Sequence, residues 1–260
     1  MITRNMSRCI VFMYVLATMV VFSSIQANAQ VTSGKSAEDY AIDATFFLLE
    51  KRYSDALTAI RKARELNPGR PEYSETEAMI LSEWVQMTYE ESGTLLTNQY
   101  RMAMNAYDEA RQLYESSGGT TEVVLNIRLE KATLAMVVND VVNAQRELQA
   151  ILREYPNDVR ANYMLGILYR NEYNRTGNES LYTASKQLFE RAVLNNTNAK
   201  YQIPYAYFYV GVSRMDEGRN REALIYLQLW LHQIKNSGRV LNGMDRYMVF
   251  LAEQYIERLK

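Results

Sequence analysis

The chain has 260 residues, of which 48% are hydrophobic and 23% charged, and its formal net charge is −1. This length can bury a sizeable core, and the interspersed acids and bases argue against a nucleic-acid-binding surface and against a disordered acidic tail. Only 4 prolines and 11 glycines are present, which favours helix.

The first 29 residues have the three-part layout of a secretory signal peptide. Arg4 and Arg8 form a basic start, residues 10–22 are apolar, and Ala27-Asn28-Ala29 is a small-x-small cleavage site. We expect cleavage after Ala29 and export to the periplasm or cell envelope. The alternative is a membrane anchor, but the apolar run of about 13 residues is shorter than the roughly 20 that a spanning helix needs. The only cysteine, Cys9, precedes this run, so the mature chain would carry neither a thiol nor a membrane span.

Helical spacing of apolar residues begins at Ala37, after a short polar segment at 30–36 that we expect to be flexible. In the first half, a second helix starts at Tyr53 and stops before Pro68, because proline ends a helix. Longer helices are expected over 71–91 and then up to Ser116, each followed by glycine. Further helices are expected over 121–138 and 142–155.

The next helix opens at Val159 and carries Leu165-Gly166 and Tyr169. The stretch 171–181 is polar and contains glycine, which predicts an inserted loop. Helical spacing then resumes with Phe189 and Ala192 on one face.

The stretch 204–237 contains the clearest repeat. Tyr207 and Gly211 lie on a first helix, Gly218 in a turn, and Ala223 and Leu227 on a second helix. These offsets resemble the tetratricopeptide repeat family, in which two antiparallel helices of about 34 residues nest at small side chains. Arg214 and Trp230 stand where the family pattern has tyrosine and alanine.

The resemblance implies an all-α fold for residues 37–260. We expect a right-handed α-solenoid of about five helix pairs, essentially without β-strand, and a final helix over 240–260 that caps the last apolar face.

No catalytic, cofactor-binding or metal-binding constellation is predicted. His232 is the only histidine, and its flanks are apolar, so we interpret it as a packing or surface residue. An enzyme is therefore the least favoured function.

The family's concave groove is lined by first-helix residues, and the resemblance places a groove for a partner segment on this chain. The residues at matching offsets are Arg160, Tyr163, Ile167, Arg170 and Asn171 in the fourth repeat, and Tyr205, Phe208, Val212 and Met215 in the fifth. Aromatic, methionine and arginine side chains suit an extended or helical peptide with an acidic group. The alternative is that these residues fill the core, as most of the 20 tyrosines are expected to do.

The function expected from these features is a non-catalytic scaffold or adaptor in the cell envelope that binds another envelope protein or a peptide segment. A small-molecule-binding helical module that assists an envelope transporter is the alternative. Self-association through the first repeats or the final helix is left open.

Overall fold

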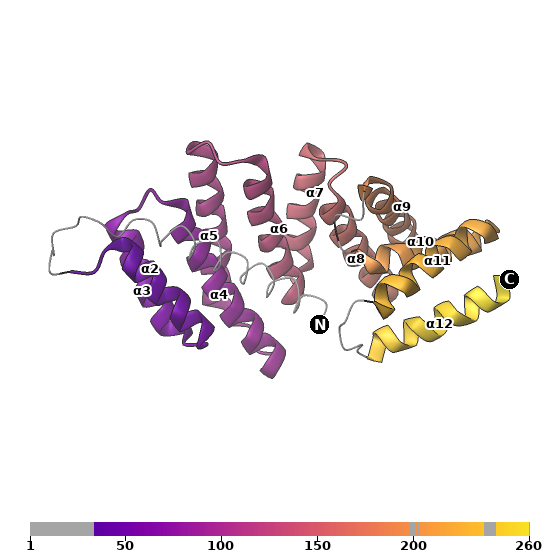
Figure 1. Ribbon diagram of the computed structural model, residues 1–260, viewed down its shortest axis with the longest axis horizontal. Coiled ribbons are helices and arrows are strands. Elements are labelled where there is room, and N and C mark those ends of the chain that lie inside the picture. Colours follow the sequence, from indigo (N-terminus) through magenta and orange to yellow (C-terminus); the bar gives the residue numbers. More distant parts are fainter. Residues whose placement is uncertain (1–33, 198–200, 202, 237–242, 260) are drawn as a thin grey trace. The chain divides into compact units, whose positions relative to one another are not determined.

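The computed structural model describes residues 34–197, 201, 203–236 and 243–259, and this part of the chain contains eleven helices and no strand (Figure 1). The all-α expectation is confirmed. The expected signal peptide, cleavage site and most of the 30–36 lead-in lie outside the described residues. The chain divides into two compact units, residues 1–140 and 141–260, and each is described by itself.

Unit 1 contains five helices: α2 (Ala37–Leu49), α3 (Tyr53–Leu66), α4 (Pro71–Ser92), α5 (Thr97–Ser116) and α6 (Thr121–Val137). Their ends follow from local chemistry. Ser36 caps α2 in a capping box with Asp39, each side chain bonding the backbone N–H of the other. Pro71 opens α4, and Gly93 ends it in the left-handed conformation at φ 68°. The helix starts expected at Ala37, Tyr53, Pro71 and Thr121 agree with the structure.

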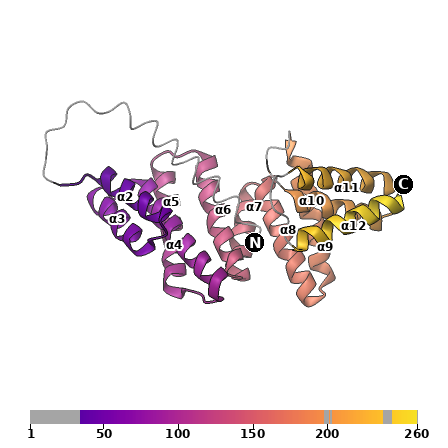
Figure 2. The same ribbon diagram turned by 60° about the horizontal axis from the view of Figure 1, so that its bottom comes forward.

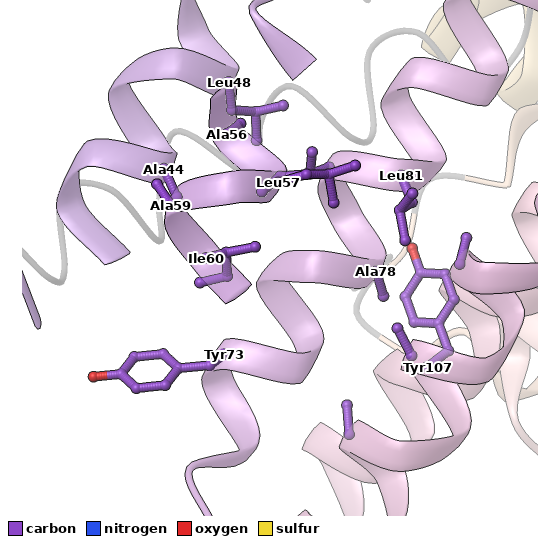
Figure 3. Packing of buried hydrophobic residues seen from close by; sticks show 14 of the residues in the cluster. Ala44, Leu48, Ala56, Leu57, Ala59, Ile60, Tyr73, Ala78, Leu81 and Tyr107 are labelled. Atoms are coloured by element: carbon purple, nitrogen blue, oxygen red, sulfur yellow. The ribbon is translucent and has the colours of Figure 1, made fainter. Parts of the chain in front are cut away.

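The core of unit 1 is built from small residues at helix contacts and larger ones beside them. Ala44 of α2 and Ala56 of α3 are fully buried, which lets the two backbones approach closely. Figure 3 shows Leu57 of α3 and Leu81 of α4 among the side chains that fill the space between helices. Ala132 of α6 is also fully buried, as its expected role in close packing requires.

A charged cluster crosses three helices of unit 1. Glu77 of α4 is only 5% exposed, and its carboxylate accepts a hydrogen bond of 2.9 Å from Nε of Arg61 and another from Nη1 of Arg64. Arg64 also pairs with Glu109 of α5. A buried carboxylate with two arginine donors is compensated, so it can stay charged inside the unit.

Unit 2 contains six helices: α7 (Val141–Glu154), α8 (Val159–Thr176), α9 (Glu179–Asn195), α10 (Pro204–Asp216), α11 (Asn220–Lys235) and α12 (Gly243–Leu259). The antiparallel pairs α8/α9 and α10/α11 lie side by side in both views, with α12 beside α11 (Figures 1 and 2). Residues 240–242 and 260 of the expected capping helix lie outside the described residues.

The expected inserted loop at 171–181 is wrong, because most of that stretch is helix. α8 continues to Thr176, and only Gly177 and Asn178 separate it from α9. Gly177 ends α8 at φ 70°, and the Asn178 side chain accepts a hydrogen bond of 3.0 Å from the N–H of Ser180 at the start of α9. The extra residues of this repeat therefore lengthen its two helices.

Two glycines set the helix approach within unit 2. A Cβ at Gly166 would lie 2.8 Å from Cε1 of Phe189, and one at Gly211 would lie 2.8 Å from Cγ of Leu227. Both distances are too short for real contacts, so only glycine fits at this spacing. The expectation that Gly166 and Gly211 allow paired helices to nest is confirmed.

Candidate interaction surface

Three of the predicted groove residues are buried in unit 2. Tyr163 of α8 is 8% exposed, and Tyr205 and Phe208 of α10 are 4% and 5% exposed. Phe208 packs against Trp230 with ring centroids 5.1 Å apart. These side chains fill the core, as the alternative interpretation of the aromatic residues expects, and they offer a partner little surface.

The other predicted residues remain partly or fully accessible. Ile167 and Arg170 of α8 and Val212 and Met215 of α10 are partly buried, and Asn171 of α8 is exposed. We call these five residues the α8/α10 face. Their role in binding a partner stays a prediction.

Arg160, the remaining predicted residue, is occupied within unit 2. Its guanidinium lies 5.0 Å from the centre of the Tyr201 ring, and its Nη2 lies 3.7 Å from Oδ2 of Asp158. The side chain is only 16% exposed. Recognition of an acidic partner group by Arg160 would first have to displace these contacts.

Arg170 lies at the centre of a cluster of three tyrosines from α8, α9 and α10. Its guanidinium carbon lies 5.5 Å from the centre of the Tyr173 ring and 4.8 Å from the centres of both the Tyr182 and Tyr209 rings. Each contact is a cation–π interaction, worth about 0.5–2 kcal/mol according to how far water is excluded. Because Arg170 belongs to α8 and Tyr209 to α10, the cluster joins the two helices that form the α8/α10 face.

Further contacts order this cluster. Tyr173 stacks on Tyr182 with centroids 5.0 Å apart, and the Tyr182 hydroxyl donates a hydrogen bond of 3.0 Å to Oδ2 of Asp216. Burial raises the pKa of Tyr182, and the Asp216 carboxylate raises it further. Burial also raises the pKa of Tyr209, although the charge of Arg170 acts in the opposite direction. Both phenols therefore stay neutral at ordinary pH.

Sequence reasoning found Arg170 but missed its three tyrosine partners. Tyr173 fell in the segment expected to be a loop, and Tyr182 directly followed it. Tyr209 fell between the predicted groove positions 208 and 212. The spacing of Arg170 and Tyr173, three residues apart on one helix, was the available signal.

The described residues hold no group of three or more histidine, cysteine, aspartate or glutamate side chains placed to bind a metal ion. Within the same residues, every helix is too short or too polar to cross a bilayer.

Antiparallel helix hairpins that stack through small residues define a helical-repeat protein. Comparison with solved structures identifies the kind of repeat. MamA from Desulfovibrio magneticus RS-1 is similar over 80% of this chain and 100% of its own, with a TM-score of 0.51 and 14% identity. Cut9, from the APC/C hetero-tetramer Cut9–Hcn1, is similar over 85% of this chain and 37% of its own, with a TM-score of 0.50 and 16% identity.

Both of these are tetratricopeptide-repeat proteins, and this chain has the tetratricopeptide-repeat fold. No protein-family model matches the sequence, and no curated protein matches it.

Proposed function

We propose that this protein is a non-catalytic scaffold that binds a segment of another protein along the α8/α10 face. The observation that carries the proposal is the Arg170 cluster, which holds α8 and α10 together through Tyr209 and leaves Asn171 exposed beside it. A rigid, partly apolar surface with polar groups at its edge is the usual composition of a protein-binding site. Cut9, which shares the fold, assembles with Hcn1 in a hetero-tetramer.

The site of action we propose is the periplasm or cell envelope. The basic start, the apolar run 10–22 and the Ala27-Asn28-Ala29 site support export. Mass spectrometry of the chain recovered from fractionated cells tests this proposal. A periplasmic or envelope-associated form that begins at Gln30 is expected, and a cytoplasmic form that retains Met1 contradicts it.

The interaction is tested by photo-crosslinking in intact cells with a benzophenone amino acid at Asn171. A matched probe at Gln112, an exposed residue on α5, serves as the control. A discrete protein adduct from Asn171 and none from Gln112 is expected. Equal adducts at both positions, or adducts from Gln112 alone, would contradict the assignment of this face.

A further inference from the structure

A second surface of unit 2 lies between α7 and α9, with α8 as its floor. It includes a wide-open hollow of 380 Å³, lined along α9 from Ala184 to Arg191 over about 10 Å, the length of roughly three extended residues. We call this hollow the α7/α9 groove. Ala184 and Gln187 also border a second, flatter hollow of 390 Å³ that is lined by α9 alone and contains Glu179.

The α7/α9 groove lies on the other side of α8 from the predicted partner surface. Leu165 and Tyr169 of α8 line the groove, whereas Ile167 and Asn171 belong to the α8/α10 face. Residues two apart on a helix point about 160° apart, because a helix has 3.6 residues per turn. The two surfaces can therefore bind different segments.

The walls of the groove carry the same pair of residues on each side. Gln149 and Arg153 lie four residues apart on α7, and Gln187 and Arg191 repeat this spacing on α9, so each pair shares one helix face. The Nε2 of Gln149 donates a hydrogen bond of 2.8 Å to the hydroxyl of Tyr169, which holds this amide at the groove wall.

Beneath these walls lie Leu165 of α8 and Leu188 of α9, both almost fully buried. They close the groove but offer a partner little surface. The accessible lining is therefore mainly the glutamine and arginine side chains of the two walls.

The two arginines are exposed, and neither has an ion-pair partner within the described residues. This is unlike Arg214, which pairs with Glu190, Glu217 and Glu222. Glu190, the acidic residue next to Arg191, is thereby paired with an arginine of α10. Two positive charges therefore remain uncompensated at one end of the groove.

We propose that the α7/α9 groove binds an acidic segment of a partner protein, with two carboxylates paired to Arg153 and Arg191. Guanidinium groups bind carboxylates through two parallel hydrogen bonds, which gives both charge and direction. The Gln149 and Gln187 amides supply partners for the backbone of the segment. Nucleic acid is the less favoured anion, since the chain has a formal net charge of −1 and only two such arginines line the groove.

Fluorescence polarisation with the full-length purified protein at low salt tests the proposal. The probes are a labelled octapeptide of alternating glutamate and leucine, its glutamine–leucine counterpart, and labelled octathymidylate. The glutamate peptide is expected to bind at least tenfold more tightly than either of the others. Equal binding of the two peptides, or preferential binding of octathymidylate, overturns the proposal.

Variants locate the binding. Arg153→Ala combined with Arg191→Ala is expected to weaken binding of the glutamate peptide at least tenfold. The control pair Arg221→Ala and Arg258→Ala removes the same charge from exposed positions on α11 and α12 of the same unit, and is expected to leave binding within twofold. An equal loss in both pairs shows non-specific charge attraction and overturns the assignment. Circular dichroism of each variant confirms that the fold is intact.

Discussion

The hydroxyl of Tyr205 donates a hydrogen bond of 2.6 Å to Oδ1 of Asp245, and both side chains are buried. Tyr205 belongs to α10 and Asp245 to the first turn of α12, so the bond ties the last helix to the hairpin before it. Met248 and Ala252 continue this contact along the buried side of α12. The terminal helix is thus fixed by a polar anchor at one end and apolar packing beyond it.

Removal of this anchor should loosen α12. Tyr205→Phe keeps the ring but withdraws one donor from a buried carboxylate, and we expect the free energy of unfolding to fall by about 1–3 kcal/mol. Urea denaturation followed by circular dichroism measures the change. Tyr247→Phe removes a hydroxyl from an exposed tyrosine of α12 and should stay within about 0.5 kcal/mol of the natural chain. A loss for Tyr205→Phe no larger than that of this control contradicts the role of the anchor.

Close helix packing at Gly211 makes a second prediction. The methyl group of Gly211→Ala would meet Leu227 at 2.8 Å and would force α10 and α11 apart, so we expect a loss of about 1–3 kcal/mol in thermal or urea unfolding. Gly243→Ala is the matched control, since no atom lies within 4 Å of a Cβ there. It should be neutral or slightly stabilising, and equal effects of the two substitutions would refute the packing argument.

The buried charge of unit 1 can be tested in the same way. Glu77→Ala leaves Arg61 without its partner and Arg64 with only Glu109, and because both arginines are partly exposed we expect a loss of about 1–3 kcal/mol. Glu65→Ala breaks an exposed pair with Lys62 and should change the free energy of unfolding by less than about 1 kcal/mol. If both substitutions have the same small effect, the Glu77 cluster does not stabilise the unit.

The environment of Glu75 predicts that the free energy of unfolding depends on pH. Burial raises the pKa of its carboxyl above the ordinary value of 4.5, and the Tyr114 hydroxyl, which donates to it at 2.8 Å, opposes this shift. The folded chain therefore holds this proton more tightly than the unfolded chain, and stability falls as pH rises from the unfolded pKa through the folded pKa. Below both pKa values the carboxyl is protonated in the folded and the unfolded chain, so the cost of burying its charge is absent.

Glu75→Gln should consequently be more stable than the natural chain at neutral pH, and the difference should vanish below about pH 4. Urea denaturation at several pH values measures it. Glu91→Gln, at an exposed position of the same helix, is the control. A Glu75→Gln effect that is independent of pH would show that desolvation of the carboxylate is not the cause.

The fold was readable from the sequence because its determinants are local. Ala44, Ala132, Gly166 and Gly211 recur at helix contacts, and the structure buries all four. The segment 171–176 was wrongly predicted to be a loop because its side chains are mostly exposed. Exposed residues of a helix are as polar as the residues of a loop. Gly177 and Asn178 lie within the expected loop, and their roles as helix cap residues allow a turn of only two residues.

The candidate surface was less predictable, because an offset within a repeat gives the direction of a side chain but not its depth. Tyr163 and Phe208 lie at the family's groove offsets, but the rings of Phe189 and Trp230 from the second helices contact them. How deeply a side chain is buried depends on such neighbours from other helices. The tyrosines around Arg170 come from three helices. The spacing of residues within one helix cannot predict contacts between side chains of different helices.

The long α8/α9 hairpin also provides a handle for experiment. α8 has 18 residues and α10 has 13, and residues 174–180 at the end of the hairpin are all exposed. The natural chain's only cysteine is Cys9, so in a chain that begins at Gln30 Arg175→Cys would supply a single thiol. A fluorophore attached there would lie one turn beyond Asn171 on α8, close enough to report both the tumbling of unit 2 and the occupancy of the α8/α10 face.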